Sequence, residues 1–206
     1  AAGLGAVRLA QIDGRTGRIG APVVAVLCTL ASPVSGLFLA LGAVAWFLAD
    51  RTHRWAAVAL GAGALVPALF LTIAFPEGGV EPFHGYSFWP AITVLVVLFL
   101  VMPRSERLLR TGIALYILAV VASFLLETPM GNNVNRLGAL FAGPLLACAL
   151  WPRRREVLLL CALPLIYWQF LSPVQDYFRA KDDASVHAVY YQGLRQFLRT
   201  QPGAYR

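Results

Sequence analysis

Five or six long apolar runs, separated by short polar segments, dominate the chain. A helix that crosses a bilayer needs about 20 apolar residues, and fewer where the bilayer is thin. Several runs are shorter than this, which suits a locally thinned bilayer or helices packed around a cavity. We therefore expect an all-α, polytopic transmembrane helical bundle with about five full spans. The spans are predicted over residues 55–75, 88–102, 111–126, 134–150 and 157–171.

Basic clusters occupy every second gap between these runs. Loops rich in Arg and Lys stay on the cytoplasmic side of a membrane. The intervening segments, residues 76–87, 127–135 and 172 onward, must then face the outside, and the two assignments alternate without conflict. The basic clusters are Arg51/His53/Arg54, Arg104/Arg107/Arg110 and Arg153/Arg154/Arg155.

The apolar run over residues 20–49 is too long for one ordinary span and too short for two full ones. Basic residues flank both of its ends, so an even number of crossings fits the charge pattern. Ser32-Pro33 interrupts the run, because proline disfavours helix at the residue before it. We predict a short helical hairpin with its tip toward the outside; a single kinked and tilted helix is the alternative.

The chain changes character after residue 171. Residues 172–183 are polar, and residues 184–200 carry apolar side chains at helical spacing with Arg195 and Arg199 on the other face. We interpret 172–206 as the start of an extracytoplasmic soluble segment with an outer amphipathic helix; a helix lying on the membrane surface is the alternative.

The predicted organisation thus has three parts. Residues 1–18 are a cytoplasmic-side lead segment, residues 19–171 form the transmembrane bundle, and the outer segment follows. Because the chain shows no initiator Met and no signal peptide, we expect it to be an internal fragment of a longer protein.

Composition supports the membrane assignment. Apolar residues make up 59% of the 206 residues and charged residues 13%, against about 25% charge in soluble domains. In a soluble protein the net charge of +7 would indicate nucleic acid, but here the arginines lie beside apolar runs. They indicate orientation and contact with anionic membrane lipids, and no nucleic-acid partner is predicted. Cys28, Cys148 and Cys161 lie inside apolar runs and are expected to be apolar fillers.

No charged residue or histidine lies in the middle of a predicted span, which argues against an ion-coupled transporter. The first outer loop carries Glu77, Glu81 and His84 among aromatic residues and glycines. Carboxylates with a histidine can bind a divalent cation or act as a general base, and aromatic residues can line a sugar subsite. The alternative is an interfacial loop whose aromatic residues lie at headgroup level.

The second outer loop, residues 127–136, carries the most specific local indication of a binding site. Asn132 or Asn133 can cap the following helix, whose free N–H groups and positive dipole favour a phosphate. Arg136 lies one turn further on, at interface depth, where an anionic partner is favourable. Plain capping, with Arg136 extended to the interface or paired with Glu127, is the alternative.

Three segments resemble large actinobacterial integral membrane proteins: LASPVSGLF at 30–38, TPMGNNVNRL at 128–137 and YYQGLRQFL at 190–198. In layout these proteins are similar to the GT-C superfamily of glycosyltransferases, which use polyprenyl-phosphate sugars. The resemblance implies many spans, short hairpins and an outer soluble domain. The superfamily's acidic catalytic residue lies in a first outer loop that would precede Ala1. Only Asn132, Asn133 and Arg136 match the expected role of holding a lipid-linked phosphate.

We therefore expect a segment of a multi-pass cell-membrane protein that acts on lipid-linked sugars at the outer face. A transporter or flippase for amphiphilic molecules and a non-catalytic membrane scaffold are the alternatives.

The predicted topology is testable by labelling single cysteines in intact cells with a membrane-impermeant thiol reagent. Cysteines at Gly78 and Gly131 should react from outside, because both lie in outer loops. A cysteine at Ser105 should stay protected, and so should one at Thr16 if residues 20–49 form a hairpin. The opposite pattern would invert the orientation, and labelling at Thr16 alone would require an odd number of crossings.

Overall fold

The structure, a computed structural model, describes residues 1–12, 14–76, 79–151 and 154–201 and is helical throughout, with no strand in those ranges. The α-helices are α1 (Ala2–Ala10), α2 (Arg15–Ala31), α3 (Pro33–Ala49), α4 (Arg54–Ala74), α5 (Gly85–Val101), α6 (Arg107–Leu125), α7 (Asn135–Leu150), α8 (Arg155–Lys181) and α9 (Gln192–Thr200). Short 3₁₀ helices cover η1 (Gly131–Val134), η2 (Ala184–Val186) and η3 (Ala188–Tyr191).

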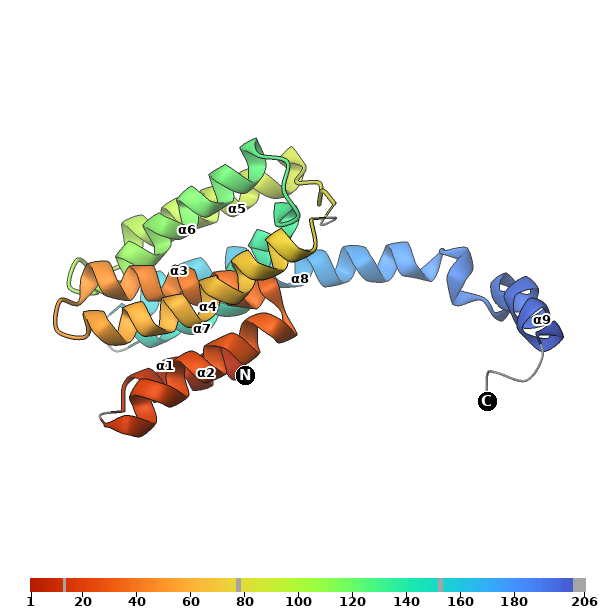
Figure 1. The fold of residues 1–206 in the computed structure, drawn as a ribbon. Helices are drawn as coiled ribbons and strands as arrows, with labels where there is room; N and C mark the ends of the chain where they lie inside the picture. Colours follow the sequence, from red (N-terminus) through yellow and green to blue (C-terminus); the bar gives the residue numbers. More distant parts are fainter. Residues whose placement is uncertain (13, 77–78, 152–153, 202–206) are drawn as a thin grey trace.

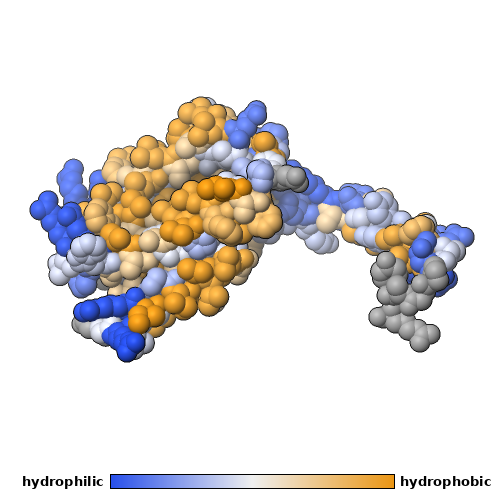
Figure 2. All heavy atoms as spheres, in the orientation of Figure 1, coloured by the Kyte–Doolittle hydropathy of each residue, from blue (hydrophilic) through white to orange (hydrophobic). Residues whose placement is uncertain are grey.

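Helices α2 to α8 run alternately in opposite directions through one bundle (Figure 1). The even-numbered helices α2, α4, α6 and α8 begin at Arg15, Arg54, Arg107 and Arg155, all at the same end. We call this the basic end, and we call the end with residues 75–84 and 126–134 the loop end. Apolar side chains cover the visible face of the bundle, and hydrophilic ones gather at the basic end and along outer α8 (Figure 2).

Four helical segments within the described ranges have the length and composition to cross a membrane: α4, α6, η1 with α7, and α8. The all-α bundle predicted from the apolar runs is therefore confirmed. Helices α3 and α5 are apolar but shorter, 17 residues each, and rise only about 25 Å. Because the bilayer core is about 30 Å thick, α5 is shorter than a standard full span.

The run over residues 20–49 is a hairpin, as predicted, and not one kinked helix. Helix α2 ends at Ala31, and α3 turns back from Ser32, whose side chain accepts a hydrogen bond from the Ser35 N–H at 3.4 Å. Pro33 takes the first helical position, where its missing N–H is not needed. A Cβ at Gly36 would overlap the Thr29 side chain, so the arms approach closely through small residues.

The Thr29 hydroxyl connects the hairpin to α4. It is fully buried and lies 3.0 Å from the Ala64 carbonyl oxygen of α4 and 3.2 Å from its own helix at Ala25. In a membrane environment, where water is absent, a polar group of this kind needs such acceptors.

The lead segment is more ordered than the sequence indicates. Residues Ala2–Ala10 form α1, which folds back along α2 with Ala6 completely buried. The nine residues of α1 are mostly Ala and Gly and include Arg8, so they form no long apolar run. For this reason the hydropathy pattern did not predict α1.

The C-terminal part differs from the prediction in two ways. Helix α8 continues past residue 171 to Lys181, through Pro164 and Pro173, and extends beyond the bundle (Figure 1). The predicted helix over 184–200 is wrong in its first half, because η2 and η3 precede α9. After α8 ends at Lys181, the Asp183 side chain accepts a hydrogen bond from the Ser185 N–H at 2.7 Å and caps the start of η2.

The described part of the bundle contains two cores. One lies among α1 to α4 and is rich in alanine; the other lies among α5 to α8 and contains Leu, aromatic residues and Met102. In the second core α7 and α8 meet at Gly138, where any Cβ would overlap the ring of Trp168, itself 6% exposed. Glycine is required here by space and not by backbone angle.

Substitution of Gly138 should therefore destabilise the bundle. We expect Gly138→Ala to lower the free energy of unfolding by about 1–3 kcal/mol, because the buried Trp168 ring must shift. Gly143→Ala on the same helix is the control, because a Cβ there meets nothing within 4 Å. Unfolding by SDS in mixed micelles, followed by tryptophan fluorescence, measures both. Equal stability of the two variants would contradict the packing described.

Candidate functional site

The two outer loops that the sequence singled out meet at the loop end. The Glu81 N–H donates a hydrogen bond to the Thr128 carbonyl oxygen at 3.1 Å. Gly131 is buried with φ +35°, and a Cβ there would overlap the Glu81 carbonyl. Both the positive φ and the contact favour glycine. A reporter cysteine for this loop therefore belongs at exposed Glu127, not at Gly131.

Neither Asn132 nor Asn133 caps α7, so the capping prediction is wrong. Both lie inside η1, which leads directly into α7, and the residue at the cap position, Val134, offers no side-chain hydrogen bond. The Asn133 amide reaches back to the Pro129 carbonyl oxygen at 3.4 Å, and Asn132 accepts from Asn135. Because η1 leads directly into α7, the helical backbone begins at Gly131, before α7 itself.

Asn135 is the polar residue that the sequence analysis missed. It is 8% exposed, and its Nδ2 donates to the Asn132 Oδ1 at 2.9 Å. Its own Oδ1 is buried and has no hydrogen-bond partner among the described residues. A buried acceptor without a donor is costly, so this oxygen can accept a hydroxyl or a water. The three-residue spacing of Asn132 and Asn135 on one face was the available signal.

A tyrosine from α6 fixes the start of α7. The Tyr116 hydroxyl donates to the Val134 carbonyl oxygen at 2.7 Å and accepts from the Gly138 N–H at 2.9 Å. These two backbone groups are the i and i+4 partners of the first turn of α7, and the hydroxyl contacts both. Tyr116 is 5% exposed and thus links α6 to the start of α7 through buried hydrogen bonds.

Arg136 is exposed one residue beyond Asn135 and forms no ion pair with Glu127 or any other described carboxylate. Its guanidinium is thus available to an anion at the loop end, because arginine matches the geometry of a phosphate with several donors.

Of the first-loop candidates, Glu77 lies outside the described residues. Glu81 and His84 are exposed, and no group of three His, Cys, Asp or Glu side chains in the described ranges could hold a metal ion. His84 stacks on Tyr86 with ring centroids 5.3 Å apart, and Tyr86 is largely exposed. This arrangement matches the interfacial alternative for the loop better than a metal site.

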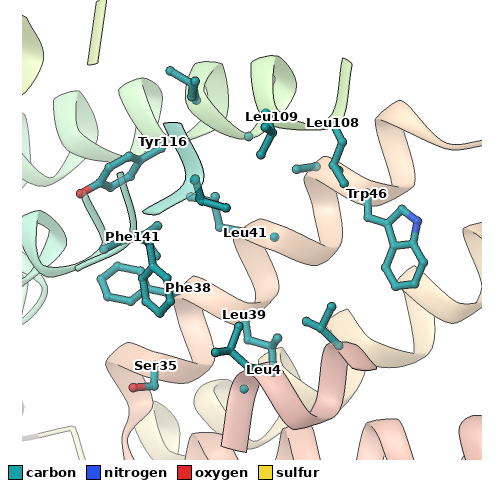
Figure 3. A pocket seen from close by; sticks show the side chains of 18 of the residues that line it. Leu4, Ser35, Phe38, Leu39, Leu41, Trp46, Leu108, Leu109, Tyr116 and Phe141 are labelled. Atoms are coloured by element: carbon teal, nitrogen blue, oxygen red, sulfur yellow. The ribbon is translucent and has the colours of Figure 1, made fainter. Parts of the chain in front are cut away.

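An apolar cavity of about 840 Å³ extends from the start of α7 into the bundle. Figure 3 shows its walls, with Phe38 and Leu41 of α3 facing Tyr116 and Phe141, and Leu4 of α1 below. Tyr116 and Gly138 both line it, so the cavity reaches the start of α7. At the other end it reaches Asp50 and His53. A cavity with these walls suits a long apolar chain with a polar group at either end.

Comparison of the chain with protein-family models, with curated proteins and with solved structures finds no match in any of the three.

The hydrogen bonds of Tyr116 give a direct test of the site's framework. Tyr116→Phe should lower the free energy of unfolding by about 1–2 kcal/mol, because it removes both bonds while preserving the ring. Tyr167→Phe on α8, where the ring is 61% exposed, is the control. Thermal unfolding in detergent micelles measures both. A loss no larger than that of the control would show that the hydroxyl does not stabilise the start of α7.

Proposed function

We propose that this chain is the lipid-binding segment of a multi-pass cell-membrane protein that acts on a polyprenyl-phosphate sugar. The observation that carries the proposal is the apolar cavity that extends directly under the polar start of α7. A polyprenyl-phosphate sugar has the matching sequence of groups: a long apolar chain, a phosphate and a hydroxylated ring.

The cavity supports binding of the apolar chain. Its volume of about 840 Å³ lies within the range of known ligand sites, and its walls are mostly aliphatic and aromatic. Helices from both cores contribute, so an occupant would contact α1, α3, α6 and α7 together. Binding of an apolar chain is favoured because the chain displaces water or disordered lipid from these walls.

The loop end supports binding of the head. Arg136 is exposed and offers charged donors for the phosphate. The exposed carboxylate of Glu81 lies on the loop that packs against Gly131 and can accept a hydroxyl. Positive charge beside the phosphate would stabilise the negative charge that develops on it when the sugar is transferred.

In this proposal the loop end is extracytoplasmic and the basic end is cytoplasmic, because arginine-rich loops are retained inside. Helix α8 then leads the C-terminal segment outward. The glycosyl-transfer step itself requires a base or metal that we assign to no residue of this chain; a divalent cation would need Glu77 or a group elsewhere.

Transport is the second candidate, because the cavity extends to Asp50 and His53 near the basic end as well. A path between both ends of the bundle is what a flippase for an amphiphile requires. The two functions share the bound lipid and differ in whether the sugar is transferred or the lipid crosses.

Two substitutions test the lipid site in the full protein. Arg136→Ala should weaken binding of decaprenyl phosphate by about 10-fold or more, because a charged hydrogen bond to phosphate is lost. Gly42→Phe should also weaken it, because Gly42 lines the cavity and a ring there fills the space. Binding is measured by native mass spectrometry in detergent.

Gly143→Phe is the matched control for Gly42→Phe, since its Cβ also meets nothing within 4 Å and Gly143 does not line the cavity. Unchanged binding in Arg136→Ala removes Arg136 from the site. Unchanged binding in Gly42→Phe removes the chain from the cavity, and both results together reject the proposal.

A further inference from the structure

A separate polar cleft lies at the basic end, away from the site at the start of α7. It is a hollow of about 730 Å³ between the α3–α4 connection and the beginning of α6. Its lining residues are Leu48, Ala49, Asp50, Arg51, Arg104, Arg107, Arg110 and Thr111. Two basic clusters that lie far apart in the sequence thus line one cleft.

The cleft carries a strong positive charge. Four arginines line it against one carboxylate, Asp50, and none of the four forms an ion pair with a carboxylate among the described residues. Asp50 is already bonded, to His53 Nδ1 at 2.8 Å and to the Thr52 N–H at 2.8 Å. These hydrogen bonds, that of His53 first, lower its pKa to about 2, so it stays ionised at neutral pH and remains directed toward its own turn.

Arg110 gives the cleft a fixed wall. Its Nη1 donates to the Phe99 and Met102 carbonyl oxygens at 2.9 and 2.8 Å, and its guanidinium lies 4.3 Å from the centroid of the Phe99 ring. These contacts close the C-terminus of α5, whose last carbonyls have no helical partner. The Nε and Nη2 donors of Arg110 make no hydrogen bond with described residues, and Arg51, Arg104 and Arg107 are exposed around it.

Arg107 is not placed to stabilise its own helix. It occupies the first turn of α6, where the positive helix dipole makes a cation unfavourable. An anion in the cleft would offset both this dipole and the mutual repulsion of the arginines. The cleft also adjoins membrane helices: Leu48 and Ala49 end α3, Thr111 begins the apolar part of α6, and Asp50 lines the apolar cavity too. In a membrane crossed by the apolar parts of α3 and α6, the cleft would lie at the level of the lipid headgroups.

We propose that this cleft binds the phosphate headgroup of an anionic membrane lipid, with Arg51, Arg104 and Arg107 as its adjustable donors and Arg110 as its fixed one. The site is independent of the polyprenyl-phosphate proposal, because it lies at the opposite end of the bundle and shares no arginine with it. A free phosphate ester has the same headgroup chemistry, and the test separates the two sources.

The test compares ligand binding to the delipidated protein by native mass spectrometry. The probes are dioleoylphosphatidylglycerol, dioleoylphosphatidylcholine and soluble glycerol 3-phosphate. We expect the wild type to bind phosphatidylglycerol in preference to phosphatidylcholine, and more weakly as salt is raised. The triple variant Arg51→Gln/Arg104→Gln/Arg107→Gln should bind phosphatidylglycerol about 100-fold more weakly, because each cation near an anionic headgroup contributes roughly a factor of five.

Arg195→Gln is the matched control: it removes one exposed arginine of α9, which lines neither the cleft nor the apolar cavity, and should leave phosphatidylglycerol binding unchanged. The single variant Arg104→Gln, with an expected loss of about fivefold, gives a readout if the triple variant unfolds. Wild-type affinity in these cleft variants would overturn the site. Binding of glycerol 3-phosphate as tight as that of the lipid would assign the cleft to a soluble phosphate ester and overturn the lipid assignment.

Discussion

The link from Tyr116 to the start of α7 is the interaction on which the loop end depends. Through the hydrogen bonds of the Tyr116 hydroxyl with the Val134 carbonyl and the Gly138 N–H, α6 fixes the rotation of α7. That rotation buries Asn135, turns Gly138 onto the Trp168 ring and leaves Arg136 exposed. A phenylalanine would leave a buried polar pair to reorganise, which is costly where water is absent.

The cavity results from the way the two cores meet. Helices α1 to α4 pack through alanine, glycine and the Thr29 hydroxyl, whereas α5 to α8 pack through larger side chains. Along the boundary between them α3 presents Gly42 and Ala45, and α6 presents Gly112, so small residues leave space that no described side chain fills. Polar groups at its two ends make the same space suitable for an amphiphile.

The two ends of the bundle differ in chemistry because they are subject to different physical constraints. At the basic end, arginines begin four helices against the preference of the helix dipole, which indicates that membrane orientation outweighs helix stability there. At the loop end, the hydrogen bond from Glu81 to Thr128 and the tight contact at Gly131 hold two loops together. Our two proposals therefore place a lipid phosphate at each end, held by an arginine-lined cleft at the basic end and by Arg136 at the loop end.

The helical class, the alternation of the spans and the hairpin break at Ser32-Pro33 could be predicted from the sequence, because hydropathy, loop charge and proline stereochemistry act locally. The sequence also identified the second outer loop as polar and unusual, but it assigned capping to Asn132 and Asn133. The position of η1 before α7, the burial of the Asn135 amide and the packing of α1 on α2 appear only in three dimensions. These features depend on contacts between residues distant in the chain, such as Tyr116 with Gly138, which no local pattern specifies. The same holds for the basic cleft, which Arg51 and Arg104 line together.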